Sequence, residues 1–316
     1  MTVTAPPPVV GVIPPGVDAA PTTGCRVVEH LAECAALLDD ARRAGRTVGL
    51  VPTMGALHAG HRSLIERASA ECDLVVVTVF VNPLQFGDPD DIERYPRTLA
   101  ADLEVASAAG AGLVFAPSVG EMYPGFPAPV ATTVVVRGIG DRWEGASRPG
   151  HFDGVATVVT KLFAMAGRCR AYFGEKDFQQ LAVVRQLAAD LSLPVEVVGC
   201  PIVRDPDGLA LSSRNVRLSA TERRAALALS RALRAGAAAI AAGERRAEVV
   251  DRRMAEVVAA EPRVHLDYAA AVDPTDLRPA TDLGPGTPVR LLVAARVGPV
   301  RLIDNLDPAR HPKGSH

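Results

Sequence analysis

The chain has 316 residues, of which 48% are hydrophobic and 22% charged, and its formal net charge at pH 7 is −2. This length favours two domains, and the composition is ordinary for a soluble globular protein with a sizeable core. The nearly balanced charge gives no electrostatic reason to expect nucleic acid or an anionic membrane surface as a partner.

The five cysteines include no Cys-x-x-Cys pair, which argues against a disulfide framework and against a cysteine-based zinc site. The N-terminus lacks the basic stretch followed by an apolar stretch that marks a signal peptide. No apolar run reaches the roughly 18 residues that a membrane span requires. We therefore expect a cytoplasmic protein.

The order of elements predicts a Rossmann-like α/β domain over residues 25–202. Residues 1–24, rich in proline and alanine, predict a disordered tail before it. Strands are predicted at Thr47–Val51, Leu74–Val81, Gly112–Phe115, Thr132–Val136, Arg170–Phe173 and Val195–Val198, and helices at His61–Cys72, Thr98–Ala109, Val155–Ala166 and Phe178–Leu191. Such alternation is typical of a doubly wound parallel sheet.

The pattern changes after this region. Two alanine- and arginine-rich helices are predicted between Ala220 and Ala260, with a break near Gly243. Strands then follow at Val264–Ala270, Val289–Ala295 and Arg301–Ile303. We interpret residues 203–306 as a smaller α+β lid domain, with the boundary near Pro201–Val203, and residues 307–316 as a flexible tail.

The most informative segment is the loop Val51-Pro-Thr-Met-Gly-Ala-Leu-His-Ala-Gly-His61, between a predicted strand and a predicted helix. Ligands bind at the carboxyl ends of strands in open α/β sheets. Gly55 and Gly60 permit sharp turns, and the N-terminus of the following helix favours phosphate. His58 and His61 can donate hydrogen bonds or carry a proton. Two structural histidines are the alternative, and zinc is disfavoured because His-Glu-x-x-His is absent.

Two neutral amides follow the next long predicted strand, in the segment Phe80-Val-Asn-Pro-Leu-Gln-Phe86. Asn82 and Gln85 would lie on the same rim of the sheet as the histidines. Amides suit a hydroxy acid, because they donate to its carboxylate and accept from its hydroxyl. A simple Asn-Pro turn with a surface glutamine is the alternative. Tyr95 follows shortly afterwards, in Tyr95-Pro-Arg-Thr98.

A third segment, Tyr172-Phe-Gly-Glu-Lys-Asp-Phe-Gln-Gln180, again joins a predicted strand to a helix. Lys176 is one of only three lysines, with Lys161 and Lys313, in a chain that otherwise uses arginine. Its compact ammonium suits phosphate oxygens, and Asp177 can accept from a ribose hydroxyl or cap the helix. The alternative is a capping aspartate beside a solvated lysine.

A fourth segment spans Val203 to Asn215 at the expected domain boundary and contains Ser212, Ser213 and Arg214. Two hydroxyls followed by a guanidinium form a donor set suited to the β- and γ-phosphates of a nucleotide. A loop at a domain junction can also close over a bound ligand and exclude water. A polar linker with a serine helix cap is the alternative.

These segments together resemble the pantothenate synthetase family of the HxGH nucleotidyltransferase superfamily. The family strings PTMGALHxGH, FVNPxQF, YPRT, FGEKDxQQ and DGLAMSSRN are matched in this order. Leu211 stands where the family usually has methionine, which has a similar volume. The resemblance extends from about Val48 to Asn305, and the segments around Glu144 and Arg148 match more loosely.

The resemblance implies an ATP-dependent ligase that adenylates pantoate and transfers the pantoyl group to β-alanine, acting as a homodimer. It implies catalytic roles for His58, His61, Lys176, Ser212, Ser213 and Arg214, and substrate binding by Asn82, Gln85, Tyr95 and Gln180. The implied ATP contacts are Met54, Gly55, Ala56, Leu57, His58, Ala59, Gly60, His61, Gly174, Glu175, Lys176, Asp177, Val203, Leu211, Ser212, Ser213 and Arg214. Mg²⁺ is the implied cofactor, with Asp102 as a candidate ligand.

Two other functions stay open from sequence alone. Another HxGH enzyme would keep the nucleotide in its product, whereas a ligase would release AMP. A nucleotide-binding sensor is compatible with the fold but would not need His58, His61 and Lys176 together. A tRNA synthetase is disfavoured by the lack of a basic surface, and a hydrolase by the lack of a Gly-x-Ser-x-Gly elbow.

Overall fold

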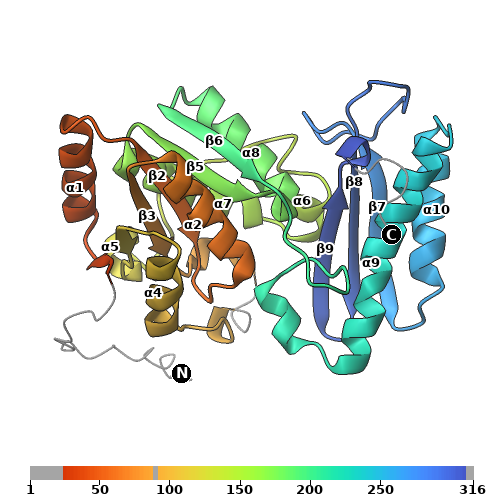
Figure 1. The fold of residues 1–316 in the computed structure, drawn as a ribbon, viewed down its shortest axis with the longest axis horizontal. Coiled ribbons are helices and arrows are strands. Elements are labelled where there is room, and N and C mark those ends of the chain that lie inside the picture. Colours follow the sequence, from red (N-terminus) through yellow and green to blue (C-terminus); the bar gives the residue numbers. More distant parts are fainter. Residues whose placement is uncertain (1–23, 88–91, 311–316) are drawn as a thin grey trace, which may run out of the picture.

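The computed structural model describes residues 24–87 and 92–310, and two sheets organise them (Figure 1). A six-stranded parallel sheet has the order β1-β4-β3-β2-β5-β6, and a three-stranded antiparallel sheet has the order β7-β8-β9. The prediction of a doubly wound α/β fold with a smaller α+β part is confirmed. The tails predicted over 1–24 and 307–316 lie outside the described residues, apart from Gly24 and residues 307–310.

The larger sheet and its helices alternate along the first two thirds of the chain. Its strands are β1 (Arg26–Val28), β2 (Val48–Thr53), β3 (Leu74–Val79), β4 (Leu113–Phe115), β5 (Cys169–Gly174) and β6 (Val195–Cys200). Its helices are α1 (Leu31–Arg43), α2 (Ala59–Glu71), α4 (Leu99–Ala108), α5 (Val119–Met122), α6 (Glu144–Ser147), α7 (His151–Ala166) and α8 (Phe178–Asp190). Two 3-10 turns, η1 (Pro83–Gln85) and η2 (Glu175–Asp177), follow β3 and β5.

Helices cover both faces of this sheet because the strand side chains alternate between two apolar clusters. On β3, Val75 and Val77 belong to the cluster that contains Ile65 of α2. Val76 belongs to the opposite cluster, which contains Leu38 of α1 and residues of α7 and α8. A strand buried on both faces reads as a continuous apolar run, which is why β3 was easily predicted.

Two parts of the sequence-based prediction need correction. Residues Thr132–Val136 form no strand, although they are rich in β-branched side chains. The backbone N–H of Val134 donates instead to the hydroxyl of Thr157 on α7 (2.9 Å), so this segment is paired with a helix rather than with a strand. Helix α1 and the short strand β1 were not predicted at all.

The second part of the chain forms a sheet with two helices on one face (Figure 1). Its elements are α9 (Ala220–Ala241), α10 (Ala247–Ala259), β7 (Val264–Val272), β8 (Arg290–Val297) and β9 (Val300–Leu306), with 3-10 turns η3 (Ser213–Arg217) before them and η4 (Pro308–Arg310) after them. Leu291 and Val293 of β8 pack in the same cluster as residues of α9 and α10, whereas Leu292 joins the core of the larger domain. The small sheet is therefore buried on both faces and shares core contacts with the first domain.

The start of α7 lies directly against the turn η1. Gly154 approaches this turn so closely that a Cβ at this position would overlap the carbonyl group of Leu84 and lie 2.6 Å from the backbone nitrogen of Gln85. The carbonyl oxygen of Gly154 also accepts from Nδ2 of Asn82 (3.1 Å). Only glycine permits this contact, which fixes η1 on the helix.

We expect Gly154→Ala to destabilise the protein by about 1–3 kcal/mol, because backbone atoms rather than a flexible side chain must move to admit the methyl group. Urea denaturation measures the change in the free energy of unfolding. Gly120→Ala in α5 is the matched control, since the nearest atom to its added Cβ is a serine oxygen at 3.8 Å. Equal stability of the two variants would contradict the close contact between α7 and η1.

Candidate active site

A cavity opens beside β2, where the order in which strands are added to the larger sheet reverses. The chain adds β3 and β4 on one side of β2, and β5 and β6 on the other. Such a switch point leaves a crevice at the carboxyl ends of the strands. The cavity there has a volume of about 220 Å³, and its walls include Thr53 at the end of β2, Thr78 on β3, Gly174 at the end of β5 and Val203 beyond β6.

His58 and His61 lie at the start of α2 and are held in defined tautomers. The backbone N–H of Gly60 donates to Nδ1 of His58 (3.1 Å), and the backbone N–H of His58 donates to Nδ1 of His61 (3.4 Å). Because Nδ1 accepts in both rings, the proton of each neutral imidazole lies on Nε2. Both rings line the cavity, so each can present an N–H donor to a ligand.

Burial keeps both imidazoles uncharged at neutral pH. It lowers the pKa of His61 to about 3, with the neighbouring His58 ring as the second cause. The pKa of His58 is lowered by burial and by the charge of Lys176. A neutral ring with its proton on Nε2 is a hydrogen-bond donor rather than a counter-ion.

The loop between β2 and α2 is held by Asp102 of α4. Its carboxylate accepts from the backbone N–H groups of Ala56 (3.1 Å) and Leu57 (2.7 Å), and Asp102 is only 2% exposed. Ala56 needs this support, because its φ of 51° lies in a region that residues other than glycine rarely adopt. Asp102 does not line the cavity. Sequence alone suggested Asp102 as a magnesium ligand. Its contacts instead favour a structural role, in which it holds this loop in position.

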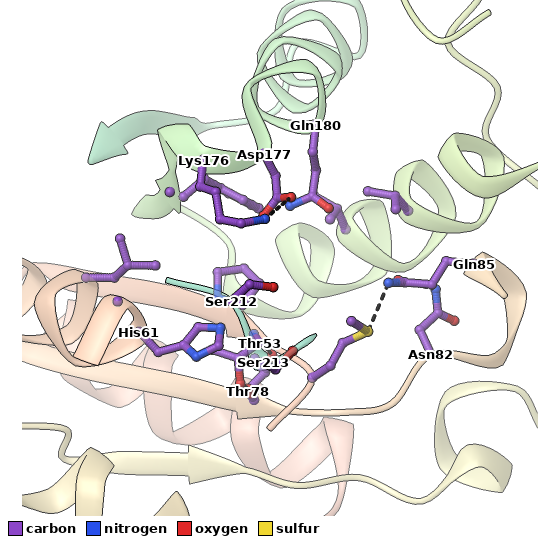
Figure 2. Close-up of a pocket in the computed structure, with 18 of the residues that line it drawn as sticks. Thr53, His61, Thr78, Asn82, Gln85, Lys176, Asp177, Gln180, Ser212 and Ser213 are labelled. Carbon is purple, nitrogen blue, oxygen red and sulfur yellow. Dashed lines mark hydrogen bonds and ion pairs between the residues drawn. The ribbon is translucent and has the colours of Figure 1, made fainter. Parts of the chain in front are cut away.

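The other end of the cavity combines an amide with an apolar wall (Figure 2). Gln85, at the end of η1, donates from Nε2 to the sulfur of Met54 (2.9 Å). Its Oε1 accepts from Nδ2 of Asn82 (3.0 Å). Side chains of α7 form the apolar wall: Val155, Val158, Val159 and Leu162. Figure 2 shows His61 and Gln85 on opposite sides of the pocket, so its two ends differ in chemistry.

The turn η2 brings Lys176 and Asp177 to the cavity, with Nζ 3.4 Å from Oδ1. Desolvation alone would raise the pKa of Asp177, but the charges of Lys176 and Arg214 hold it below its ordinary value. Gln180, in the first turn of α8, lines the cavity beside them. Glu175 points elsewhere and pairs with Arg290 of β8 (3.0 Å).

Ser212, Ser213 and Arg214 complete the wall formed by the segment that leads into the second domain. The Ser212 hydroxyl accepts from the backbone N–H of Arg214 (3.3 Å) and begins η3. Leu211 is anchored by its backbone N–H, which donates to the carbonyl oxygen of Val203 (3.0 Å). Within residues 24–87 and 92–310, no carboxylate pairs with the Arg214 guanidinium, which leaves this cation for a ligand.

Arg148 and His151 line the cavity although sequence reasoning gave them no role. Arg148 donates to Nε2 of His151 (3.0 Å), so His151 carries its proton on Nδ1 and donates to the carbonyl oxygen of Gln85 (2.8 Å). Burial lowers the pKa of His151 to about 4 and that of Arg148 to about 10, the nearby Arg148 and Arg214 charges adding to the respective shifts. A sequence separation of 66 positions between His151 and Gln85 hides this contact from sequence reasoning.

Most residues expected at the site do line the cavity. They are Met54, His58, Gly60, His61, Asn82, Gln85, Tyr95, Gly174, Lys176, Asp177, Gln180, Val203, Leu211, Ser212, Ser213 and Arg214. The exceptions are Gly55, Ala56, Leu57, Ala59, Glu175 and Asp102. In the part of the chain that the structure describes, no three His, Cys, Asp or Glu side chains cluster as a metal site, and no helix is long and apolar enough to cross a membrane.

The family model described as pantoate-beta-alanine ligase matches residues 26–307. The chain belongs to the pantoate–β-alanine ligase family. It is 55% identical to the pantothenate synthetase of Rubrobacter xylanophilus, over 84% of this chain and 92% of that protein. The family identifies the chain as an enzyme, a ligase of pantoate and β-alanine in pantothenate biosynthesis.

Solved structures of this ligase family have the same fold. Pantothenate synthetase from Thermus thermophilus is 49% identical, with a TM-score of 0.82 over 90% of this chain and 99% of that one. The ligase from Francisella tularensis is 31% identical, with a TM-score of 0.73 over 92% of this chain and 100% of that one. That ligase was solved in complex with β,γ-ATP and β-alanine.

We expect Asp102→Asn to destabilise this ligase even without Mg²⁺ or nucleotide. The amide nitrogen cannot accept, so a backbone N–H of Ala56 or Leu57 loses its partner, at a cost of about 1–3 kcal/mol in the free energy of unfolding. Urea denaturation of the ligand-free protein measures it. Glu104→Gln on the exposed face of α4 is the control. An unchanged stability together with a changed Mg²⁺ requirement would favour metal binding by Asp102 instead.

The free energy of unfolding should also fall as the pH is lowered from about 6.5 to 4. Unfolded His61 takes up a proton near its ordinary pKa of 6.5, whereas the folded ring, with a pKa of about 3, does not. The unfolded state therefore binds more protons in this window and is favoured by acid. We expect His61→Gln to flatten the dependence measured by denaturation at several pH values. The same replacement at exposed His265 should leave it unchanged, and an unaltered slope in His61→Gln would contradict the buried neutral ring.

Proposed function

We propose that the chain condenses (R)-pantoate with β-alanine in two steps through a pantoyl-adenylate intermediate, releasing pyrophosphate and then AMP. One observation carries the proposal: a single cavity holds N–H donors and cations at one end and an amide against an apolar wall at the other. The first end suits a triphosphate, and the second suits a small branched hydroxy acid. An acid and a nucleotide bound in one cavity are the reactants of an adenylation.

At the phosphate end, the protein groups that would bind the phosphates are the two imidazole donors, Lys176, the serine hydroxyls and Arg214. Charge-assisted hydrogen bonds from Lys176 and Arg214 are the stronger contacts. His58 and His61 supply donors whose orientation is fixed before the ligand arrives. Such preorganised donors stabilise charge that develops on phosphate oxygens without reorganising during the reaction.

At the acid end, Gln85 and Gln180 would hold pantoate. Pantoate carries two methyl groups on one carbon, and the four aliphatic side chains of α7 offer these methyls an apolar surface. An amide donor at Gln85 suits a carboxylate or hydroxyl oxygen. Tyr95 also lines the cavity, with its ring 5.8 Å from that of Phe86.

The chemistry follows from placing the two ends together. A carboxylate resists attack by an amine because oxide is a poor leaving group, whereas AMP is a good one. The pantoate carboxylate would attack the α-phosphorus, pyrophosphate would leave, and the β-alanine amine would then displace AMP from the acyl carbon. Most of the acceleration comes from positioning and from stabilising charge, so no covalent enzyme intermediate is required.

Mg²⁺ is proposed as the cofactor that neutralises charge on the phosphate oxygens when bound. Proteins usually hold Mg²⁺ through one or two carboxylates together with substrate phosphates. Asp177 fits this requirement because its carboxylate lines the cavity beside Lys176. The Asp102 carboxylate is already occupied by two backbone N–H groups and fits less well.

A side cavity of about 40 Å³ is the proposed entry point for β-alanine. It shares Arg148, His151, Lys176, Asp177 and Gln180 with the main cavity. Arg148 has no carboxylate partner among the described residues, so its half-buried guanidinium favours the carboxylate of a small amino acid. The β,γ-ATP and β-alanine bound to the Francisella tularensis relative support extending ATP and β-alanine as substrates to this chain. We further propose that the protein acts as a homodimer and is located in the cytoplasm.

The direct test incubates purified protein with ATP, Mg²⁺ and pantoate, with and without β-alanine, and measures AMP and pyrophosphate. We expect AMP release to require both pantoate and β-alanine. Pyrophosphate exchange with pantoate alone would place adenylation first. A nucleotidylated product, or no turnover by folded protein, would overturn the proposed reaction.

In the same assay, His61→Ala should slow formation of pantoyl adenylate by roughly 100-fold, the scale for loss of one donor to a developing charge. Rapid-quench measurement of the adenylate isolates this step from β-alanine attack. His265→Ala, on the exposed surface of β7, is the matched control and should behave as the wild type. An unchanged adenylation rate in His61→Ala would remove this residue from the mechanism.

A further inference from the structure

Asn82 is one of the residues that sequence reasoning assigned to substrate, yet its side chain has no hydrogen-bonding capacity left. Its Nδ2 donates to Oε1 of Gln85 (3.0 Å) and to the carbonyl oxygen of Gly154 (3.1 Å). Its Oδ1 accepts from the hydroxyl of Tyr123 (2.8 Å) and from the backbone N–H of Leu84 (3.3 Å). An asparagine side chain has two donor hydrogens and two acceptor positions, and all four are used. Asn82 is also only 1% exposed.

The orientation of the Asn82 amide is dictated by groups that cannot exchange roles. The Gly154 carbonyl can only accept, and the Leu84 N–H can only donate. Nδ2 must therefore face Gly154, and Oδ1 must face Leu84. The same Nδ2 reaches Gln85, so Gln85 has to present its oxygen to Asn82 and its NH₂ group to the cavity.

Tyr123 supplies the remaining contact from 41 residues away in the chain. Its hydroxyl must donate, because Oδ1 of Asn82 can only accept. The Tyr123 ring is buried beside Phe80, with centroids 6.1 Å apart, and Lys161 Nζ lies 5.8 Å from the ring centre. Packing thus fixes the ring, and the ring fixes the hydroxyl on Asn82.

The Gln85 NH₂ group is left facing the pocket with a weak partner. Among the residues that the structure describes, its hydrogen-bond partner is the Met54 thioether, and a thioether sulfur is a weak acceptor that an oxygen of a ligand outcompetes. The Gln85 backbone is fixed as well, because its carbonyl oxygen accepts from His151. Both the position and the polarity of this amide are therefore set before any ligand binds.

We propose that Asn82 contacts no substrate and that Asn82 and Tyr123 are positioning residues, which hold the Gln85 amide with its NH₂ group toward the acid substrate. Gln85 then recognises an acceptor oxygen and disfavours a group that can only donate. The inference rests on the proposed function, since it assumes that pantoate binds at this end of the cavity.

Tyr123→Phe tests the proposal because it removes one hydroxyl and keeps the ring. The KM for pantoate should rise roughly fivefold, the scale of one neutral hydrogen bond. The KM for ATP and the kcat at saturating pantoate should stay within about twofold, since neither depends on Gln85 orientation once pantoate is bound. Tyr172→Phe is the matched control: Tyr172 is equally buried, but its hydroxyl contacts Glu71 and Cys72.

A double-mutant cycle separates positioning from general structural damage. If Tyr123 acts through Gln85, Tyr123→Phe in a Gln85→Ala background should leave the KM for pantoate unchanged. Asn82→Ala should likewise add nothing to Gln85→Ala. Should Asn82→Ala fail to fold, the Tyr123 cycle still decides, and thermal unfolding of each variant monitors folding.

Three outcomes would overturn the inference: an unchanged KM in Tyr123→Phe, an equal rise in the Gln85→Ala background, or an equal rise in Tyr172→Phe. A further loss from Asn82→Ala in the Gln85→Ala background would show direct contact between Asn82 and substrate. These failures differ from failure of the proposed function, in which the wild-type protein releases no AMP with pantoate and β-alanine.

Discussion

The arrangement of the cavity depends on the buried ion pair between Glu175 and Arg290, which joins the two sheets. Glu175 opens the turn that carries Lys176, and Arg290 begins β8. Burial alone would raise the pKa of Glu175, but the charges of Arg290 and Arg310 hold it below its ordinary value. Asn305 of β9 adds to the junction by donating to the carbonyl oxygens of Glu175 (2.9 Å) and Lys176 (2.8 Å). The second domain therefore fixes the backbone of Lys176, which lines the cavity.

A second buried pair joins the domains on the side of α6. Arg301 of β9 makes two hydrogen bonds to Glu144 (2.5 and 2.8 Å) and one to Asp267 (2.6 Å), and Tyr268 donates to Glu144 (2.8 Å). Buried ion pairs often contribute little net stability, because desolvation offsets their attraction. Losing one partner is costly, however, since it leaves a charge uncompensated. Such pairs restrict how the two sheets can be arranged more than they strengthen the fold.

Many of the residues expected at the site meet in one cavity because they lie in loops at strand ends. The segments around His58, Gln85 and Lys176 each follow a strand that apolar periodicity reveals, and parallel strands bring their carboxyl ends to one edge. The same reasoning could not assign orientation. Asn82 has the right residue type and place for a ligand contact, but only the three-dimensional structure shows that other protein groups occupy all of its donor and acceptor positions. Asp102 is a second example: its residue type suits a metal ligand, but the structure shows that its carboxylate binds backbone N–H groups of a loop distant in sequence.

The remaining discrepancies come from long-range contacts. Residues Thr132–Val136 have the β propensity of a strand, yet among the described residues no strand pairs with them, which illustrates how far context overrides β propensity. Tyr123 contacts Asn82, and His151 contacts Gln85. Neither carries a local sequence pattern that links it to this turn, because the contacts arise only through tertiary packing. Residues that line the cavity can be predicted from sequence patterns here, whereas the residues that hold them in place are found only in the tertiary structure.

The electrostatics of the cavity explain why its histidines would serve as donors. Lys176, Arg148 and Arg214 surround the pocket, and the charge of Lys176 contributes to the lowered pKa of both His58 and His61. Lys176, which would meet a triphosphate, thus adds to the burial that keeps both imidazoles neutral before a ligand binds. Bound phosphates would offset those charges and raise the pKa of both rings. Hydrogen bonds from the imidazole N–H groups would then strengthen as negative charge develops on the phosphate oxygens. The cavity would therefore stabilise the transition state more than the bound substrates.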